Sequence, residues 1–155
     1  MKILKIVLIS FVLWIYPSAG ENNGGCYAEV DNIDFGNYNP FEPVIKRTYT
    51  TLQVICNTQN RVTFTIRLIG GNSNNPGRRF LFSPSTEGKL YYNLFYRGCI
   101  WGDGTQNTCV ISGITRSKRN LFSNKSFTIV GIIPPMQNVP VANDYQDHLT
   151  VIVEY

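Results

Sequence analysis

The fold class is decided by the stretch RVTFTIRLI, residues 61–69. From Arg61 to Leu68 its apolar residues alternate with polar or charged ones, and a period of two is typical of a strand with one buried face. Similar alternation or strong β propensity marks four further segments, which we expect to form strands. These segments are residues 52–56, 90–96, 127–133 and 149–155.

Turn-forming residues separate these strands, and no stretch shows the spacing of an amphipathic helix. Glycine, asparagine and proline gather in residues 36–40, 70–77 and 101–104, and Pro134-Pro135 closes the fourth strand. Roughly six or seven short strands at this spacing are typical of an immunoglobulin-like sandwich or a small barrel. The sequence therefore predicts one all-β domain.

The first twenty residues have the pattern of a secretory signal peptide. Lys2 and Lys5 precede an apolar run over residues 6–16, and small residues follow at 17–20. The run is shorter than the ~20 apolar residues that a membrane-spanning helix needs. We expect cleavage after Gly20, which leaves a soluble, exported domain of residues 21–155 without a membrane span.

The charge balance of that domain argues against nucleic acid as a partner. The chain has 14 Lys and Arg against 10 Asp and Glu, and removing Lys2 and Lys5 leaves 12 against 10, a net charge of +2. Nucleic-acid-binding domains carry a strongly basic patch or stripe. Charged residues make up 15% of the chain, below the ~25% of average globular proteins, as in many secreted β proteins.

The four cysteines predict disulfides. An even number in an exported chain favours bridges over free thiols, and four cysteines allow three pairings. A zinc site would need clustered cysteine and histidine ligands, but His148 is the only histidine. The cysteines are Cys26, Cys56, Cys99 and Cys109.

Six short motifs, in a fixed order along residues 26–155, carry a family resemblance. They are FGNYNP (35–40), LQVIC (52–56), LYYNL (90–94), WGDGT (101–105), GIIP (131–134) and DYQDHLTV (144–151), together with Arg79 and Gln137. In this order they resemble the spore coat protein U family, which is also the subunit family of archaic (Csu-type) chaperone-usher pili.

The resemblance implies an immunoglobulin-like sandwich that lacks its final strand. Family members fold on a periplasmic chaperone and leave through an outer-membrane usher to the cell surface, and a sister pilus subunit then supplies the missing strand. The sequence agrees in one respect, because its last strand runs to Tyr155 with nothing after it to cover the edge. The expected groove for the donor strand is lined by Leu149, Val151, Val153, Tyr155 and Phe35.

The family also implies one of the disulfide pairs. A bridge between Cys26 and Cys56 matches the family pattern, whereas a bridge between Cys99 and Cys109 rests on their proximity in the sequence. The second bridge would close a local loop around Trp101.

One departure from the family pattern concerns the direction of assembly. A shaft subunit carries an alternating apolar donor segment before its first cysteine, but here residues 21–25 are short and polar. This chain is therefore expected to accept a strand and not to donate one, as a terminal or minor subunit. The alternative is a stand-alone secreted coat or surface-binding protein that fills its own groove or exchanges strands with a second copy.

No residue pattern predicts an enzyme, a cofactor or a metal centre. His148 is the sole histidine, and Asp103, Asp144 and Asp147 lie in turn-like segments without a nucleophile motif. Asp144 and Asp147 could supply oxygen ligands to calcium, but hydrogen bonding within loops is the favoured interpretation.

Two further features have a structural and a surface interpretation. Trp101, in its glycine-rich loop, is expected to pack in the core, with contact to an outside surface as the alternative. Five of the basic residues are expected to form a solvated rim, with binding to an acidic surface as the alternative. They are Arg78, Arg79, Arg116, Lys118 and Arg119.

Overall fold

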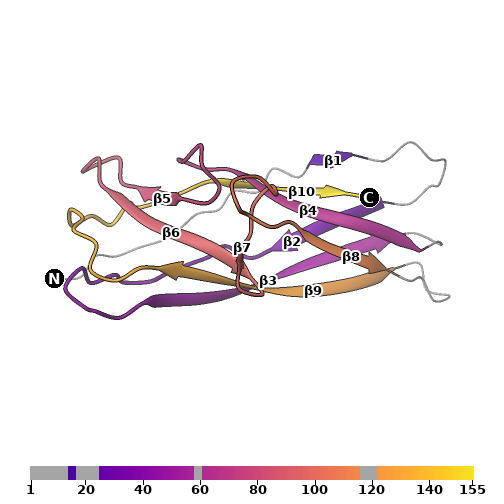
Figure 1. The fold of residues 1–155 in the computed structure, drawn as a ribbon, viewed down its shortest axis with the longest axis horizontal. Helices are drawn as coiled ribbons and strands as arrows, with labels where there is room; N and C mark the ends of the chain where they lie inside the picture. The colour runs from indigo at the N-terminus through magenta and orange to yellow at the C-terminus, as the bar shows by residue number, and fades with distance from the viewer. Residues whose placement is uncertain (1–13, 17–24, 58–60, 116–121) are drawn as a thin grey trace.

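The computed structural model describes residues 14–16, 25–57, 61–115 and 122–155, and these residues form a β-sandwich (Figure 1). No helix long and apolar enough to cross a membrane occurs in these ranges. The strands are β1 (Trp14–Tyr16), β2 (Gly25–Val30), β3 (Lys46–Asn57), β4 (Val62–Gly70), β5 (Arg79–Phe82), β6 (Lys89–Tyr96), β7 (Cys99–Ile100), β8 (Ile111–Thr115), β9 (Ser123–Ile133) and β10 (Leu149–Glu154).

The strands form two sheets that pack face to face. The smaller sheet has the order β1-β10-β4-β8, and the larger has the order β2-β3-β9-β6-β5, with β7 paired to β6 (Figure 1). Apart from the parallel pair β1 and β10, neighbouring strands run antiparallel. The prediction of an all-β, immunoglobulin-like sandwich is confirmed.

The stretch that decided the fold class forms β4, in the middle of the smaller sheet. Phe64, Ile66 and Leu68 are buried, whereas Arg67 is exposed, as the alternation requires. On β8, next to β4, the Phe64 ring covers Gly113, where an added Cβ would lie 2.4 Å from a ring carbon. β8 and the short strand β5 were not among the strands that the sequence predicted individually, because neither has a long alternating pattern.

The longest pairing joins β3 to β9 and forms the middle of the larger sheet. Its register runs without interruption from Lys46 opposite Ile133 to Cys56 opposite Ser123. Part of this pairing faces the core between the two sheets. Its buried inward-facing residues are Leu52, Val54, Phe127 and Ile129.

Both expected disulfide pairs are present in the structure. Cys26 and Cys56 lie directly opposite each other on β2 and β3, and their bond is wholly buried. The other bond, between Cys99 and Cys109, closes a loop at the surface of the sandwich.

The two bonds should differ in their contribution to stability. Replacing Cys26 and Cys56 by alanine should lower the free energy of unfolding by about 3 to 4 kcal/mol through loop entropy, with a further loss from the cavity left in the core. The matched variant with Cys99 and Cys109 replaced should lose about 3 kcal/mol without a core cavity. Urea denaturation of both variants and the parent checks this order, and an equal or reversed loss would contradict it.

Candidate functional site at the edge of strand β10

β10 lies near one edge of the smaller sheet. Its inner neighbour is β4, with Leu149 opposite Gly70 and Glu154 opposite Thr65. On its other side the backbone of β1 runs parallel to it, with Ile15 opposite Val153 (Figure 1). From the sequence no segment of the chain was expected on this side, because β1 falls within the segment assigned to the signal peptide.

The cleavage after Gly20 stays a prediction, because β1 lies before this position and is present in the structure. Cleavage there would remove β1, and the outer side of β10 would then face no other strand of the described residues. Backbone N–H and C=O groups of an uncovered edge strand are ready to pair with an added strand. The edge of β10 is therefore the candidate site for strand binding.

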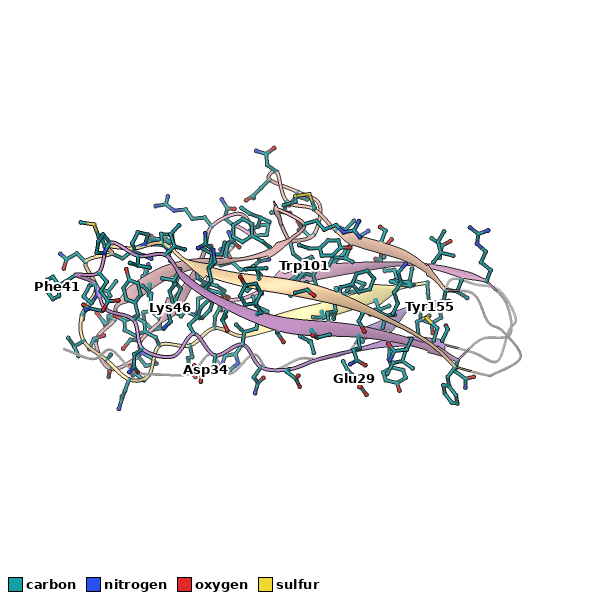
Figure 2. The ribbon with its side chains drawn as sticks, turned by 90° about the horizontal axis from the view of Figure 1, so that it is seen from below. Glu29, Asp34, Phe41, Lys46, Trp101 and Tyr155 are labelled. Carbon is teal, nitrogen blue, oxygen red and sulfur yellow. A yellow bond between two sulfur atoms is a disulfide. The ribbon has the colours of Figure 1, made fainter. Side chains whose placement is uncertain are left out.

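Four of the five expected groove residues lie on β10 or directly after it. Leu149, Val151 and Val153 point into the sandwich and are buried, alternating with half-buried outward residues. Tyr155 is half-buried, and its hydroxyl would lie 2.9 Å from a Cβ added at Gly25, so the end of β10 approaches the start of β2. Figure 2 shows Tyr155 far from the end of the molecule where Phe41 projects.

Phe35 lies elsewhere in the core. Its ring packs edge-to-face on Tyr92 of β6, with 5.6 Å between the ring centroids. It also covers Gly131 of β9, where an added Cβ would lie 2.8 Å from the Phe35 ring. Phe35 therefore packs on the larger sheet, whereas the other four expected residues belong to the smaller one.

Asp147 fixes the start of β10. Its buried carboxylate accepts hydrogen bonds from the backbone N–H of Asn72 (2.6 Å) and of His148 (2.9 Å), and from the hydroxyl of Tyr92 (2.7 Å). Gly71 has a φ of 96°, and a Cβ there would lie 2.8 Å from the carboxylate, so this position requires glycine. The carboxylate thus ties the loop after β4 and the middle of β6 to the first residues of β10.

Asp144 holds the segment just before. Its carboxylate accepts hydrogen bonds from the Ser83 hydroxyl and from the backbone N–H of Ser85 (2.8 Å), and the bond from Ser83 is the main cause that lowers its pKa. Both aspartates are thus used in loop hydrogen bonds, as the favoured interpretation stated. Within the described ranges, no three metal-ligating side chains come together.

Arg79 connects the two sheets from inside the core. Its guanidinium donates to Asn93 Oδ1 (2.9 Å), to the Trp101 carbonyl (2.9 Å) and to the Leu68 carbonyl (3.3 Å). The side chain is fully buried, and burial lowers its pKa. The prediction that Arg79 belongs to a basic rim is wrong. Arg78 is exposed, whereas residues 116, 118 and 119 lie outside the described residues.

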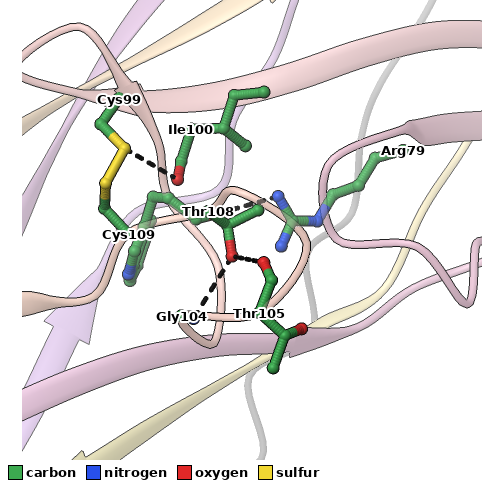
Figure 3. Close-up of a disulfide and its surroundings, with 8 residues drawn as sticks. Arg79, Cys99, Ile100, Gly104, Thr105, Thr108 and Cys109 are labelled. Carbon is green, nitrogen blue, oxygen red and sulfur yellow. Dashed lines mark hydrogen bonds between the residues drawn. A yellow bond between two sulfur atoms is a disulfide. The ribbon is translucent and has the colours of Figure 1, made fainter.

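Trp101 belongs to the core, and the alternative of an exposed adhesive ring is wrong. The residue is 1% exposed, and its indole Nε1 donates to the Ile66 carbonyl (3.2 Å). Two contacts hold the loop around Trp101 (Figure 3). One is the disulfide between Cys99 and Cys109, and the other is the hydrogen bond that the Thr108 hydroxyl donates to the Thr105 carbonyl (2.7 Å).

The buried hydrogen bonds of Arg79 to Asn93 and of Tyr92 to Asp147 were not anticipated from the sequence. Arg79 and Asp147 were noted separately, one as a basic surface residue and one as a loop carboxylate. The available signal was Tyr92, a hydroxyl-bearing residue on the apolar face of a strand, because a buried hydroxyl needs a hydrogen-bond partner.

Replacing Tyr92 by phenylalanine should change how stability depends on pH. Burial, and next the charge of Asp147, raise the pKa of Tyr92 well above its ordinary value of 10.0. The folded state therefore keeps a proton that the unfolded chain releases above pH 10, and the parent loses up to about 1.4 kcal/mol per pH unit there through this group. Tyr92→Phe should be less stable at pH 7 by about 1 to 3 kcal/mol, and this gap should narrow above pH 10.

Urea denaturation of the parent and the variant at pH 7, 10 and 11 provides the measurement. Two stability curves that stay parallel over this range would contradict the assigned role of the Tyr92 hydroxyl.

Comparison with solved structures places the fold beside that of a pilus subunit complex. The chain is similar to a chain of the CsuC-CsuE chaperone-tip adhesion subunit pre-assembly complex from archaic chaperone-usher Csu pili of Acinetobacter baumannii. The TM-score is 0.61 at 19% sequence identity, and the match covers 85% of this chain and 40% of the other. This chain therefore matches less than half of the length of its structural relative.

Sequence comparisons identify the family. A comparison with curated protein sequences gives no match. The family model described as the Spore Coat Protein U domain matches residues 21–152, which is most of the chain and begins directly after the expected signal peptide. This chain belongs to the Spore Coat Protein U domain family.

Proposed function

We propose that this chain is a structural or adhesive subunit of a bacterial surface fibre assembled by a chaperone-usher pathway, and that it accepts a donor strand along β10. The observation that carries the proposal is the position of β10. Its inward side chains belong to the core, while its outer side pairs only with Trp14–Tyr16 among the described residues. Membership of the family and the fold shared with the Csu complex support the same function.

The energy of strand addition suits such a role. A donor strand that buries four or five apolar side chains contributes on the order of 6 to 15 kcal/mol before the loss of chain entropy. A whole domain is stable by only ~5 to 15 kcal/mol. The domain of residues 21–155 is therefore marginally stable alone and depends on a periplasmic chaperone, and later on a sister subunit, for its last strand.

The start of the domain supports a terminal position for this subunit. β2 begins at Gly25, and its second residue is bonded to β3 by the buried disulfide of Cys26. Residues 21–24 before it are polar or glycine and have no alternating apolar side chains to insert into another subunit. The subunit accepts a strand without donating one, which places it at the end of the fibre that the usher exports first.

A donor peptide should stabilise the domain of residues 21–155. A peptide of about a dozen residues with alternating apolar side chains, present at 100 times its Kd, should add ~2.7 kcal/mol to the free energy of unfolding because it binds only the folded state. Thermal melts with and without the peptide measure the gain. The control is a peptide of the same composition whose apolar residues are clustered. Its apolar side chains cannot all point to one face of a strand, so they cannot all be buried against the core.

The second candidate function is a self-contained coat or surface-binding protein, and the pairing of β1 with β10 favours it. In that case the full chain of residues 1–155 carries its own strand. It should melt higher than residues 21–155 and gain nothing from the peptide. If residues 21–155 alone form a well-behaved monomer whose melting temperature the peptide leaves unchanged, the donor-strand proposal is wrong.

Immunogold labelling of intact fibres tests the terminal position. We expect the label at fibre tips, and deletion of the subunit should reduce fibre initiation or adhesion more than fibre length. Label at regular intervals along the shaft would contradict a terminal subunit. It would mean that a donor segment lies within residues 1–20 and that cleavage occurs earlier than Gly20.

A further inference from the structure

The outward face of the larger sheet carries an unusual set of aromatic and basic side chains. Phe80 of β5 and Tyr91 of β6 are directly opposite each other, and their rings pack edge-to-face with 6.0 Å between centroids. Arg78 lies over the Tyr91 ring (4.8 Å), and Lys89 lies over the Phe80 ring (5.0 Å). These four side chains form a continuous row, which we call the cation-aromatic row.

Further apolar side chains extend this face across the sheet. Tyr49 of β3 is opposite Val130 of β9, which is in turn opposite Phe95 of β6. Tyr49 is 66% exposed, and Val130 and Phe95 are half-buried although they face away from the core. The outward face thus presents aromatic and aliphatic groups on several neighbouring strands.

The part of this face that β3, β5, β6 and β9 form carries only cations, whereas the exposed Glu29 lies on β2, at the opposite edge of the sheet from β5. None of the strands β3, β5, β6 and β9 contains an aspartate or a glutamate. Within the described ranges, the structure contains one ion pair, between Arg67 and Glu154 of the smaller sheet. Among the described residues, Arg47, Arg78 and Lys89 therefore form no ion pair with a carboxylate. A ligand that supplies anionic groups would meet cations that are not already paired.

We propose that this outward face binds an anionic polysaccharide, with Arg78 and Lys89 contacting its carboxylates. Guanidinium and ammonium groups recognise carboxylates by charge-assisted hydrogen bonds. The ring contacts hold both side chains in place before binding, which reduces the entropy lost on association. The apolar C–H faces of the sugar rings match the exposed ring of Tyr49 and the aliphatic groups beside it.

The position of these side chains on the strands of a sheet and the modest net charge favour this partner over two others. A single-stranded nucleic acid needs open aromatic faces for stacking together with a strongly basic groove, but here cations already cover Phe80 and Tyr91, and residues 21–155 carry a net charge of only +2. A membrane surface suits apolar side chains that project from loops or from an amphipathic helix, whereas these side chains lie within a sheet. The site is separate from β10, so it does not depend on donor-strand binding.

The test measures binding of the full chain to polygalacturonate, with neutral dextran, single-stranded DNA and phosphatidylglycerol vesicles as comparison ligands. We expect binding to polygalacturonate that weakens with added salt, and weaker binding to the other three. Arg78→Gln combined with Lys89→Gln should reduce the affinity at least tenfold. Tyr49→Ser should reduce it several-fold, because this substitution removes the exposed ring.

Arg61→Gln is the matched control, because it removes an exposed cation that directly precedes β4 of the opposite sheet. This variant should bind like the parent, and unchanged thermal melts should show that all the variants are folded. Equal binding of dextran, stronger binding of DNA or vesicles, or parental affinity in the Arg78 and Lys89 double variant would each overturn the proposal.

Discussion

The need of β10 for a hydrogen-bonding partner on its outer side is the constraint on which the rest of the structure depends. A backbone strand has hydrogen-bonding groups on both sides, and β4 can satisfy only one side. The chain offers Trp14–Tyr16 for the other, in parallel orientation. Whether this strand comes from the same chain, from a chaperone or from a sister subunit is the difference between the functions considered above.

The polar groups inside the sandwich keep that edge in register. Asp147 fixes the residues that lead into β10, and Arg79 links β4, β6 and the Trp101 loop through carbonyl and amide oxygens. A buried polar group is costly unless it is hydrogen-bonded, so these contacts allow few alternative packings. The core therefore fixes the position of β10 through contacts that involve no residue of β1.

The fold was predictable because its main strands alternate so regularly. β4, β6 and β10 could each be found from polarity alone, since one face of each strand is buried against the other sheet. The disulfide of Cys26 came from the family pattern, and Trp101 was correctly expected to pack. Arg79 was not predictable as a core residue, because its partners are backbone carbonyls and an asparagine brought together only by the tertiary fold.

The candidate site was predictable only in part. Leu149, Val151 and Val153 follow from alternation, whereas the position of Phe35 depends on the path of the long connection between β2 and β3. The partner of β10 in the structure was not anticipated, since an apolar run after two lysines indicates a signal peptide and not a strand.

The connection before β10 has a mechanical consequence. The backbone of Gln146 exchanges two hydrogen bonds of 2.9 Å with Phe82 of β5, and three residues later Leu149 pairs with Gly70 of β4. Tension applied along β10 is therefore passed to both sheets, because Asp147 lies between the residue that pairs with β5 and the residue that pairs with β4. Because β10 and β4 lie side by side, such a pull loads their hydrogen bonds in shear, all together, and not one after another as in peeling. The pairing of β10 with β4 should therefore resist force best when the pull is along the strand direction.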